Sequence, residues 1–191
     1  MTGPAETYSI CSLLDREASK LARSLADSIS EWLGATSDLA ASSLEHLSYH
    51  VAEAYDLDAL EQRLQRVART VSHPLVLRTA GLGLFVGDEA RVLFLAVAPT
   101  PELLALQASV FEAAGGISRR QRETFRPGRW LPHITLAHAG KPGPDGSERL
   151  LEVPGRGRGT SSSFEMRLDG LSVICNLAGC DEPLLRVPFG R

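Results

Sequence analysis

Two short segments of this chain pair a histidine with a hydroxyl residue two positions later. The first is residues 46–49, with the sequence HLSY, and the second is residues 133–136, with the sequence HITL. Because side chains alternate across a β-strand, His46 and Ser48 are predicted to share one face of a strand, as are His133 and Thr135. The residues between them are apolar and are expected to point into the core. Each strand would therefore present one titratable ring and one hydroxyl side by side.

A histidine beside a hydroxyl is suited to phosphoryl transfer. An imidazole with an ordinary pKa near ~6.5 accepts or donates a proton near neutral pH, and a hydroxyl donates hydrogen bonds to phosphoryl oxygens. If the two strands face each other, one histidine would deprotonate a water molecule or a ribose hydroxyl, and the other would protonate the leaving oxygen. Ser48 and Thr135 would hold the phosphate and stabilise the transition state. One such acid or base typically contributes ~10²–10⁴-fold in rate, and the sequence leaves open which histidine takes which role.

This scheme requires no metal ion and no cofactor. The carboxylates form no obvious cluster that could hold a catalytic divalent cation. The cysteines Cys11, Cys175 and Cys180 contain no CxxC pair, which argues against a disulfide framework and against a structural zinc site. We therefore predict a metal-independent reaction with His46 and His133 as the catalytic pair.

Three further histidines must be weighed against this pair. His50 has the same strand parity as His46, so it is the true member of the pair in another register, a helper on the substrate side, or a surface histidine. His73 and His138 have no hydroxyl residue two positions later in a clear strand. These two are expected to be structural or exposed.

A basic segment precedes the second motif. Its five arginines fall within 11 residues and either steer phosphates into the groove or form a solvated loop. The two nearest to His133 are the favoured candidates for substrate binding, with Trp130 as a candidate for stacking on a base or, as the simpler expectation, for covering the core. The arginines are Arg119, Arg120, Arg122, Arg126 and Arg129, so the favoured two are Arg126 and Arg129.

The elements around the two motifs follow the same order twice. A strand at Tyr8–Leu14 is followed by an amphipathic helix that begins after Asp15, a good N-cap residue, and then by the HLSY segment. A strand at Val92–Ala98 is followed by a helix that begins at Thr100 with proline at its first position, and then by the HITL segment. The strand ends lie 32 and 35 residues before their histidines. Although strand–helix–strand units are common, this repeat supports two similar lobes whose histidine strands face each other across a groove.

The remaining elements are shorter. Asp58 and Glu61 resemble a capping box at the start of a second amphipathic helix. Strands are expected at 75–77, 82–86, 164–168, 171–175 and 184–187. Residues 141–163 are rich in glycine, proline and serine and predict a flexible surface loop, in which the GRGRG stretch at 155–159 is expected to be a plain linker.

Length and composition are those of an ordinary compact protein. The chain has 191 residues, of which 43% are hydrophobic and 23% charged, so one domain over residues 1–191, made of two intertwined lobes, is expected. The net charge of −3 excludes a polycation that coats nucleic acid. The first residues do not resemble a signal peptide, and no apolar run is long enough to span a bilayer. We expect a cytoplasmic monomer with no membrane partner.

The two motifs resemble the signature of the 2H phosphoesterase superfamily, and the nearest branch is the bacterial 2′-5′ RNA ligase or RNA 2′,3′-cyclic phosphodiesterase (LigT-like) type. The second motif with its surroundings, WLPHITLA at 130–137, is very close to the family pattern. The PELL helix start at 101–104 and GLGLF at 81–85 are also similar to it. The resemblance covers roughly residues 8–187 by the order of elements.

This resemblance implies an α+β fold with two pseudo-symmetric antiparallel-sheet lobes, helices outside and a central catalytic groove. It implies that His46 and His133 are catalytic, that Ser48 and Thr135 bind phosphate, and that the substrate is an RNA end or a small nucleotide. In the first motif Ser48 stands where threonine is usual. His50 stands where the family often carries lysine, and it could partly replace that cation.

The resemblance implies cleavage of 2′,3′-cyclic phosphates or of 2′-5′ linkages in RNA or small nucleotides, and we therefore expect a phosphodiesterase that hydrolyses 2′,3′-cyclic phosphate ends of RNA or small nucleotides. A first alternative is another reaction on the same scaffold: ligation to a 2′-5′ bond, or hydrolysis of an ADP-ribose cyclic phosphate or of a cyclic oligonucleotide. A second alternative is a non-catalytic module that binds nucleotides or RNA. A pure binding module has little need for both histidines, which favours an enzyme.

Overall fold

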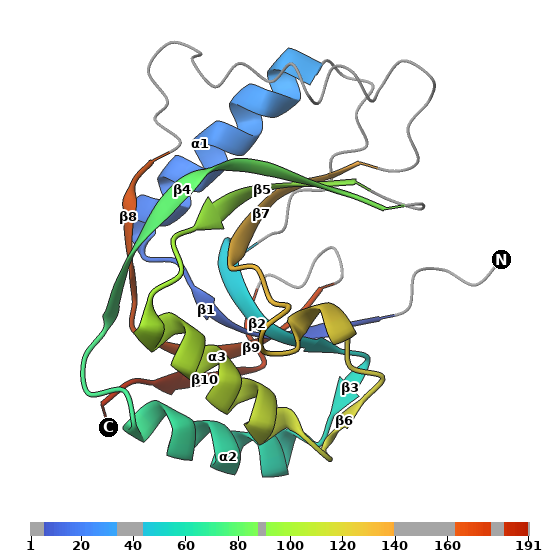
Figure 1. The fold of residues 1–191 in the computed structure, drawn as a ribbon, viewed down its shortest axis with the longest axis vertical. Helices are drawn as coiled ribbons and strands as arrows, with labels where there is room; N and C mark the ends of the chain where they lie inside the picture. The colour runs from blue at the N-terminus through green and yellow to red at the C-terminus, as the bar shows by residue number, and fades with distance from the viewer. Residues whose placement is uncertain (1–5, 34–43, 88–90, 140–162, 177–181, 191) are drawn as a thin grey trace, which may run out of the picture.

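A computed structural model describes residues 6–33, 44–87, 91–139, 163–176 and 182–190. Within these residues, three α-helices and a 3₁₀ turn accompany a large antiparallel sheet and a small two-stranded one (Figure 1). In chain order the elements are β1 (Tyr8–Leu13), α1 (Arg16–Leu33), β2 (His46–Ala52), β3 (Ala54–Tyr55), α2 (Leu57–Arg69), β4 (Leu75–Val86), β5 (Arg91–Val97), α3 (Pro101–Ala114), β6 (Ser118–Arg119), η1 (Glu123–Phe125), β7 (His133–Ala139), β8 (Glu165–Leu168), β9 (Gly170–Cys175) and β10 (Leu185–Pro188).

The large sheet has eight strands in the order β10-β9-β1-β2-β7-β5-β4-β8. Its two central strands, β2 and β7, are the strands that begin with His46 and His133. On one side, β2 pairs with β1, and on the other side, β7 pairs with β5. The units β1-α1-β2 and β5-α3-β7 therefore occupy equivalent places in the two halves of the sheet. The predicted architectural repeat and the α+β class are confirmed.

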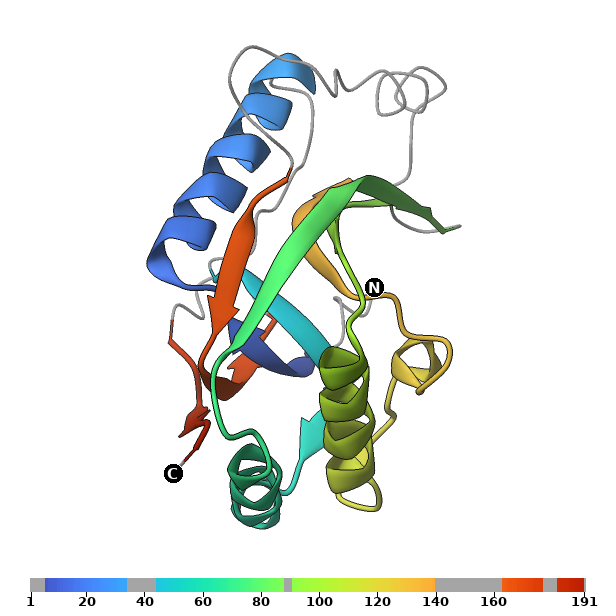
Figure 2. The same cartoon turned by 60° about the vertical axis from the view of Figure 1, so that its left-hand side comes forward.

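The helix of each repeated unit packs against strands in the other half of the sheet. Helix α1 contacts β7 and β8, whereas α3 contacts β2, and α2 contacts β9 and β10. Figure 2 shows α1 at one end of the molecule and the pair α2 and α3 at the other. The core lies between the sheet and these helices and includes Leu47, Leu95 and Ile134, all of which are fully buried. Burial of apolar surface by a helix from the opposite unit couples the two halves of the fold.

Two of the predicted helix caps are confirmed and one is wrong. Asp15 Oδ1 accepts hydrogen bonds from the backbone N–H groups of Glu17 and Ala18, and Thr100 caps α3 in the same way. Helix α2 instead begins two residues earlier than predicted, because Asp56 Oδ1 accepts from the backbone N–H of Ala59. Asp56 has the extended backbone that an N-cap requires, while Asp58 lies within the first turn.

The strands predicted at 75–77 and 82–86 form one strand, β4. Its pairing with β5 shifts register between Thr79 and Gly81, and Gly81 has a φ of 118°. A bulge at a glycine bends a strand without ending it, so the break in the apolar pattern is an irregularity inside β4. The pair β3–β6 and the turn η1 were not predicted, because two- and three-residue elements leave no periodic pattern.

The other outcomes concern membranes, cysteines and the glycine-rich segment. Among the described residues, no helix combines the length and apolar character that crossing a bilayer demands. The side chains of Cys11 and Cys175 are both buried. The predicted loop at 141–163 lies almost wholly outside the described residues, as does Cys180.

Candidate active site

The two motifs lie side by side at the centre of the sheet. Strands β2 and β7 are antiparallel, and Leu47 is the pairing partner of Ile134. When this register is continued by one residue in each direction, Ser48 lies opposite His133, and His46 lies opposite Thr135. Leu47 and Ile134 are fully buried in the core, so alternation directs the four neighbouring side chains to the opposite face.

This register makes the two histidines diagonal neighbours on one face. Diagonal positions in an antiparallel pair are typically ~7–8 Å apart, a span that long or aromatic side chains can bridge. The two hydroxyl residues occupy the other diagonal of the same four-residue set. The site set, defined as His46, Ser48, His133 and Thr135, therefore alternates imidazole and hydroxyl residues on one face of the sheet.

Both histidine rings are held in the same way. His46 Nδ1 lies 2.7 Å from the carbonyl oxygen of Leu44, and His133 Nδ1 lies 2.8 Å from the carbonyl oxygen of Leu131. In each case the acceptor is the backbone two residues earlier. Because a carbonyl oxygen can only accept, Nδ1 must carry the hydrogen, and the lone pair of the neutral ring is on Nε2. Both rings are thereby prepared to exchange a proton through Nε2.

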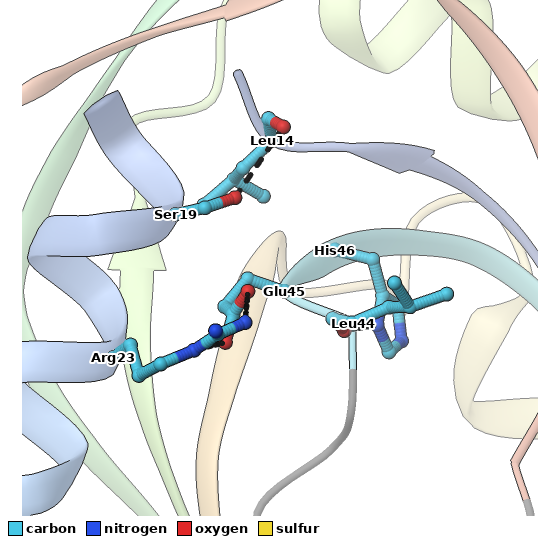
Figure 3. A network of polar contacts seen from close by, with 6 residues as sticks. All are labelled: Leu14, Ser19, Arg23, Leu44, Glu45 and His46. Atoms are coloured by element: carbon cyan, nitrogen blue, oxygen red, sulfur yellow. Dashed lines mark hydrogen bonds and ion pairs between the residues drawn. The ribbon is translucent and has the colours of Figure 1, made fainter. Parts of the chain in front are cut away.

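The residues that lead into His46 are fixed by an ion pair from helix α1. Arg23 Nε and Nη2 donate to the two carboxylate oxygens of Glu45 at 2.9 and 2.8 Å (Figure 3). The hydrogen bond and the charge of Glu45 raise the pKa of Arg23. The backbone of Glu45 also accepts from the N–H of Leu14 at 3.1 Å. These contacts fix the chain next to Leu44, whose carbonyl orients the His46 ring.

Ser48 is tied to the second motif through Trp130. The indole Nε1 of Trp130 donates to the backbone carbonyl of Ser48 at 3.0 Å, and the ring lies 5.9 Å from that of Tyr49. Trp130 is buried within the main core. This position agrees with the expectation that its side chain covers the core, and it argues against stacking on a substrate base.

The predicted face shared by His46, Ser48 and His50 is interrupted. The pairing of β1 with β2 shifts register between Ile10 and Cys11, so alternation does not continue from Ser48 to His50. His50 is fully buried, and the expectation of a surface histidine is wrong.

The ring of His50 lies in a polar and aromatic pocket. Its Nδ1 lies 2.7 Å from the hydroxyl of Tyr55, its Nε2 lies 3.2 Å from Oε1 of Gln121, and its ring centre lies 5.3 Å from that of Phe111. Burial lowers the pKa of His50, and the hydrogen bond with Gln121 opposes this effect. A neutral, enclosed ring is poorly suited to replace a substrate-side cation, so we do not assign it that role.

The remaining candidates are dispersed. Arg126 forms an ion pair of 3.0 Å with Glu123, and Arg129 is exposed. Their part in substrate binding stays a prediction. His73 is exposed, as expected, and the side chain of His138 lies outside the described residues. No three side chains of histidine, cysteine, aspartate or glutamate within the described residues are grouped so that they could hold a metal ion.

Two phenylalanines beside His133 were missed by the sequence reasoning. The ring centre of Phe85 lies 5.0 Å from that of His133, and the ring centre of Phe94 lies 5.3 Å away. The signal that could have found them is Gly83. A Cβ there would lie 2.3 Å from Cζ of Phe94, so only glycine fits beneath that ring.

Comparisons with known proteins identify the family of this chain. The family model described as the 2′-5′ RNA ligase superfamily matches residues 24–175. No curated protein sequence matches the chain.

Several solved structures share the fold. TT0787 of Thermus thermophilus has a TM-score of 0.62 and 19% identity, over 96% of this chain and 98% of that chain. E. coli LigT, solved with 3′-AMP, has a TM-score of 0.62 and 15% identity, over 97% and 98%. Usb1 of Kluyveromyces marxianus, solved with uridine monophosphate, has a TM-score of 0.54 and 11% identity, over 97% and 99%. The family match and the shared fold together establish that this chain belongs to the 2′-5′ RNA ligase superfamily, with the LigT-like fold of the 2H phosphoesterases.

Proposed function

We propose that this protein is a metal-independent phosphodiesterase that hydrolyses 2′,3′-cyclic phosphates at RNA ends or on small nucleotides. The observation that carries the proposal is the site set on the paired strands β2 and β7. In this set both histidine rings are held by the backbone carbonyl oxygen two residues earlier. Two rings prepared in the same way and placed diagonally can act on opposite sides of one phosphorus atom. The relatives solved with 3′-AMP and with uridine monophosphate support a nucleotide substrate.

In the proposed reaction one histidine is the base and the other is the acid. Nε2 of the first takes a proton from water, and the water oxygen forms a bond to phosphorus. The bond between phosphorus and the ribose 3′ oxygen breaks, and the second histidine gives that oxygen a proton, which leaves a 2′-phosphate. Ser48 and Thr135 donate hydrogen bonds to the non-bridging oxygens, where negative charge increases in the transition state.

The two hydroxyls are suited to this role. Ser48 is 8% exposed and Thr135 is partly buried, so water competes weakly with a bound phosphate. Within the described part of the chain, neither hydroxyl is occupied by a hydrogen bond to protein. Each hydroxyl can therefore donate to a bound phosphate without first breaking a hydrogen bond to protein.

The first experiment measures hydrolysis of 2′,3′-cyclic nucleotides and of short RNAs with a cyclic phosphate end, in the presence of EDTA. We expect turnover by the wild-type protein, a 2′-phosphate product and a bell-shaped dependence of kcat/KM on pH, because two groups titrate. His46→Ala and His133→Ala should each lower kcat by ~10²–10⁴-fold. The matched control is His73→Ala, which removes an exposed histidine and should retain full activity.

Wild-type turnover by either His46→Ala or His133→Ala, with folding verified by circular dichroism, would contradict the assignment of the pair. Loss of activity on addition of EDTA would contradict metal independence. The product also separates the alternative reactions, because a joined oligonucleotide indicates ligation to a 2′-5′ bond. If no cyclic phosphate on the panel is cleaved, the same variants are tested on ADP-ribose cyclic phosphate and on cyclic oligonucleotides.

A further inference from the structure

An aromatic pair lies next to the site set, at the far end of the β4–β5 hairpin. The rings of Phe85 and Phe94 are stacked, with centres 4.1 Å apart and planes inclined by 26°. Both rings contact the ring of His133 in an edge-to-face arrangement, with interplanar angles of 82° and 61°. Phe94 is 4% exposed, whereas Phe85 is 37% exposed. One face of the Phe85 ring is therefore used by Phe94, and part of the ring remains open to solvent.

The strand register places this pair on the same face of the sheet as the site set. Thr135 is the partner of Phe94 on β5, and Phe94 is the partner of Gly83 on β4. Directly paired residues project from the same face of a sheet. The packing supports this placement, because the flanking Leu93 and Leu95 belong to the main core cluster, whereas Phe94 is buried but packs outside that cluster. The aromatic pair thus extends the row that contains Thr135 and, by the register of β2 with β7, His46.

The neighbouring row is lined by small residues. His133 is the partner of Ala96, and Ala96 is the partner of Gly81. A Cβ at Gly81 would meet no described atom within 4 Å. Because Ala96 and Gly81 have little or no side chain, the sheet surface beside His133 is shallow at these two residues. The two phenyl rings border this shallow surface. A low floor with an aromatic border is the shape that receives a flat ring.

We propose that Phe85, backed by Phe94, is the subsite that stacks on the nucleobase of the substrate. This inference rests on the proposed function and adds the recognition of a base to it. A nucleotide whose phosphate lies in the site set would extend its ribose over Ala96 and its base against Phe85. Stacking on a phenyl ring tolerates any base, because every base has a π-face. The subsite therefore selects cyclic phosphates that carry a base over those without one.

The test compares two substrates that differ only in the base. One is 2′,3′-cyclic AMP, and the other is 1-O-methylribose 2′,3′-cyclic phosphate. We expect Phe85→Ala to raise KM for the nucleotide about tenfold, with kcat changed less than about twofold, and to leave both constants for the base-free compound unchanged. Phe85→Trp should retain the wild-type KM. The matched control is Val86→Ala, which alters the next residue of β4, 67% exposed, and should affect neither substrate.

The outcomes separate this subsite from the proposed function. If Phe85→Ala lowers kcat equally on both substrates, the ring only positions His133, and the subsite is overturned while the function stands. Unchanged constants on both substrates also overturn it. If the wild-type protein cleaves neither substrate, the proposed function fails, and calorimetric titration with 3′-AMP decides the subsite. Binding that Phe85→Ala weakens about tenfold supports it, whereas equal binding by both proteins, or none by the wild type, overturns it.

Discussion

A buried histidine next to the first motif makes the stability of this protein depend on pH. His50 is fully enclosed by Tyr55, Phe111 and Gln121, and burial lowers its pKa below the ordinary value. In the unfolded chain the ring takes up a proton near pH ~6.5, and in the folded protein only at lower pH. Between these two pH values the unfolded state binds more protons. The free energy of unfolding must therefore fall as the pH is lowered from neutrality through this window.

Replacing His50 with glutamine should remove this contribution. The wild-type protein is expected to lose stability between pH 7.5 and 5.5 by at most ~1.4 kcal/mol per pH unit from this residue, the limit for one proton. Urea unfolding at both pH values measures the difference. His73→Gln, in which an exposed histidine is replaced, should keep the wild-type pH dependence. Identical pH dependence in His50→Gln and the wild type would show that His50 is not the titrating group.

At the scale of elements, helix α1 connects both halves of the sheet to the site. Its N-cap, Asp15, accepts from the helix through Oδ1 and from the backbone N–H of Arg167 in β8 through Oδ2 at 2.7 Å. Burial raises the pKa of Asp15, but the backbone hydrogen bonds outweigh it, and the net pKa is lowered. About two turns further along, Arg23 of the same helix holds Glu45 at the entry to β2. A shift of α1 would therefore reach His46.

Removing the Asp15 carboxylate should loosen this helix. Asp15→Ala is expected to lower the free energy of unfolding by about 1–2 kcal/mol, the upper part of the usual range for a lost N-cap, because the bond to Arg167 is lost as well. Denaturation by urea at pH 7 provides the measurement. Asp15→Asn, which keeps an acceptor oxygen, should lose less. A stability loss of Asp15→Ala below that of Asp15→Asn would contradict the capping role.

At the scale of the whole molecule, the two halves of the large sheet meet where β2 pairs with β7. This short pairing is the joint between the halves. Strands β2 and β7 share the single pair Leu47–Ile134 in the described ladder, and the indole bond from Trp130 to Ser48 reinforces it. Buried Gln107 adds a second tie, because its Nε2 donates to the carbonyl oxygens of Tyr49 and Phe125. The site set lies across this joint, so its geometry is set by contacts between the halves and not within either one.

Trp130→Phe tests the joint, because it keeps an aromatic ring and removes the N–H donor. We expect a loss of about 1–3 kcal/mol from the unpaired buried carbonyl of Ser48 and a several-fold lower kcat/KM for the cyclic phosphate. The control is Tyr49→Phe, which removes the hydroxyl bonded to Ser12 within one half of the sheet at 2.8 Å. That variant should lose stability without a matching loss of activity. Equal activity losses in the two variants would contradict a special role for the joint.

Much of the fold could be predicted from local pattern. Asp15 and Thr100 mark helix starts because capping depends on a few adjacent residues. The alternating pattern of residues 133–136 predicts a strand, and β7 does begin at His133. The N-cap of α2 is predicted at Asp58, but the cap is Asp56, an equally good capping residue two positions earlier. Only the backbone conformation in the structure shows which of the two caps the helix. Gly81 lies between the two strands predicted at 75–77 and 82–86, and sequence alone does not distinguish a bulge within one strand from a turn between two.

The sequence by itself determined the two histidine–hydroxyl motifs, their repeated setting and the chemistry they suit, because alternation and capping are properties of short segments. Only the tertiary structure decided what surrounds them. The burial of His50 depends on a bulge and on Gln121, which is distant in the chain, and the exchange of helices between halves depends on packing. The approach of Phe85 to His133 likewise requires three strands in one register. Contacts between distant segments are chosen by the burial of the whole core, which no local pattern records.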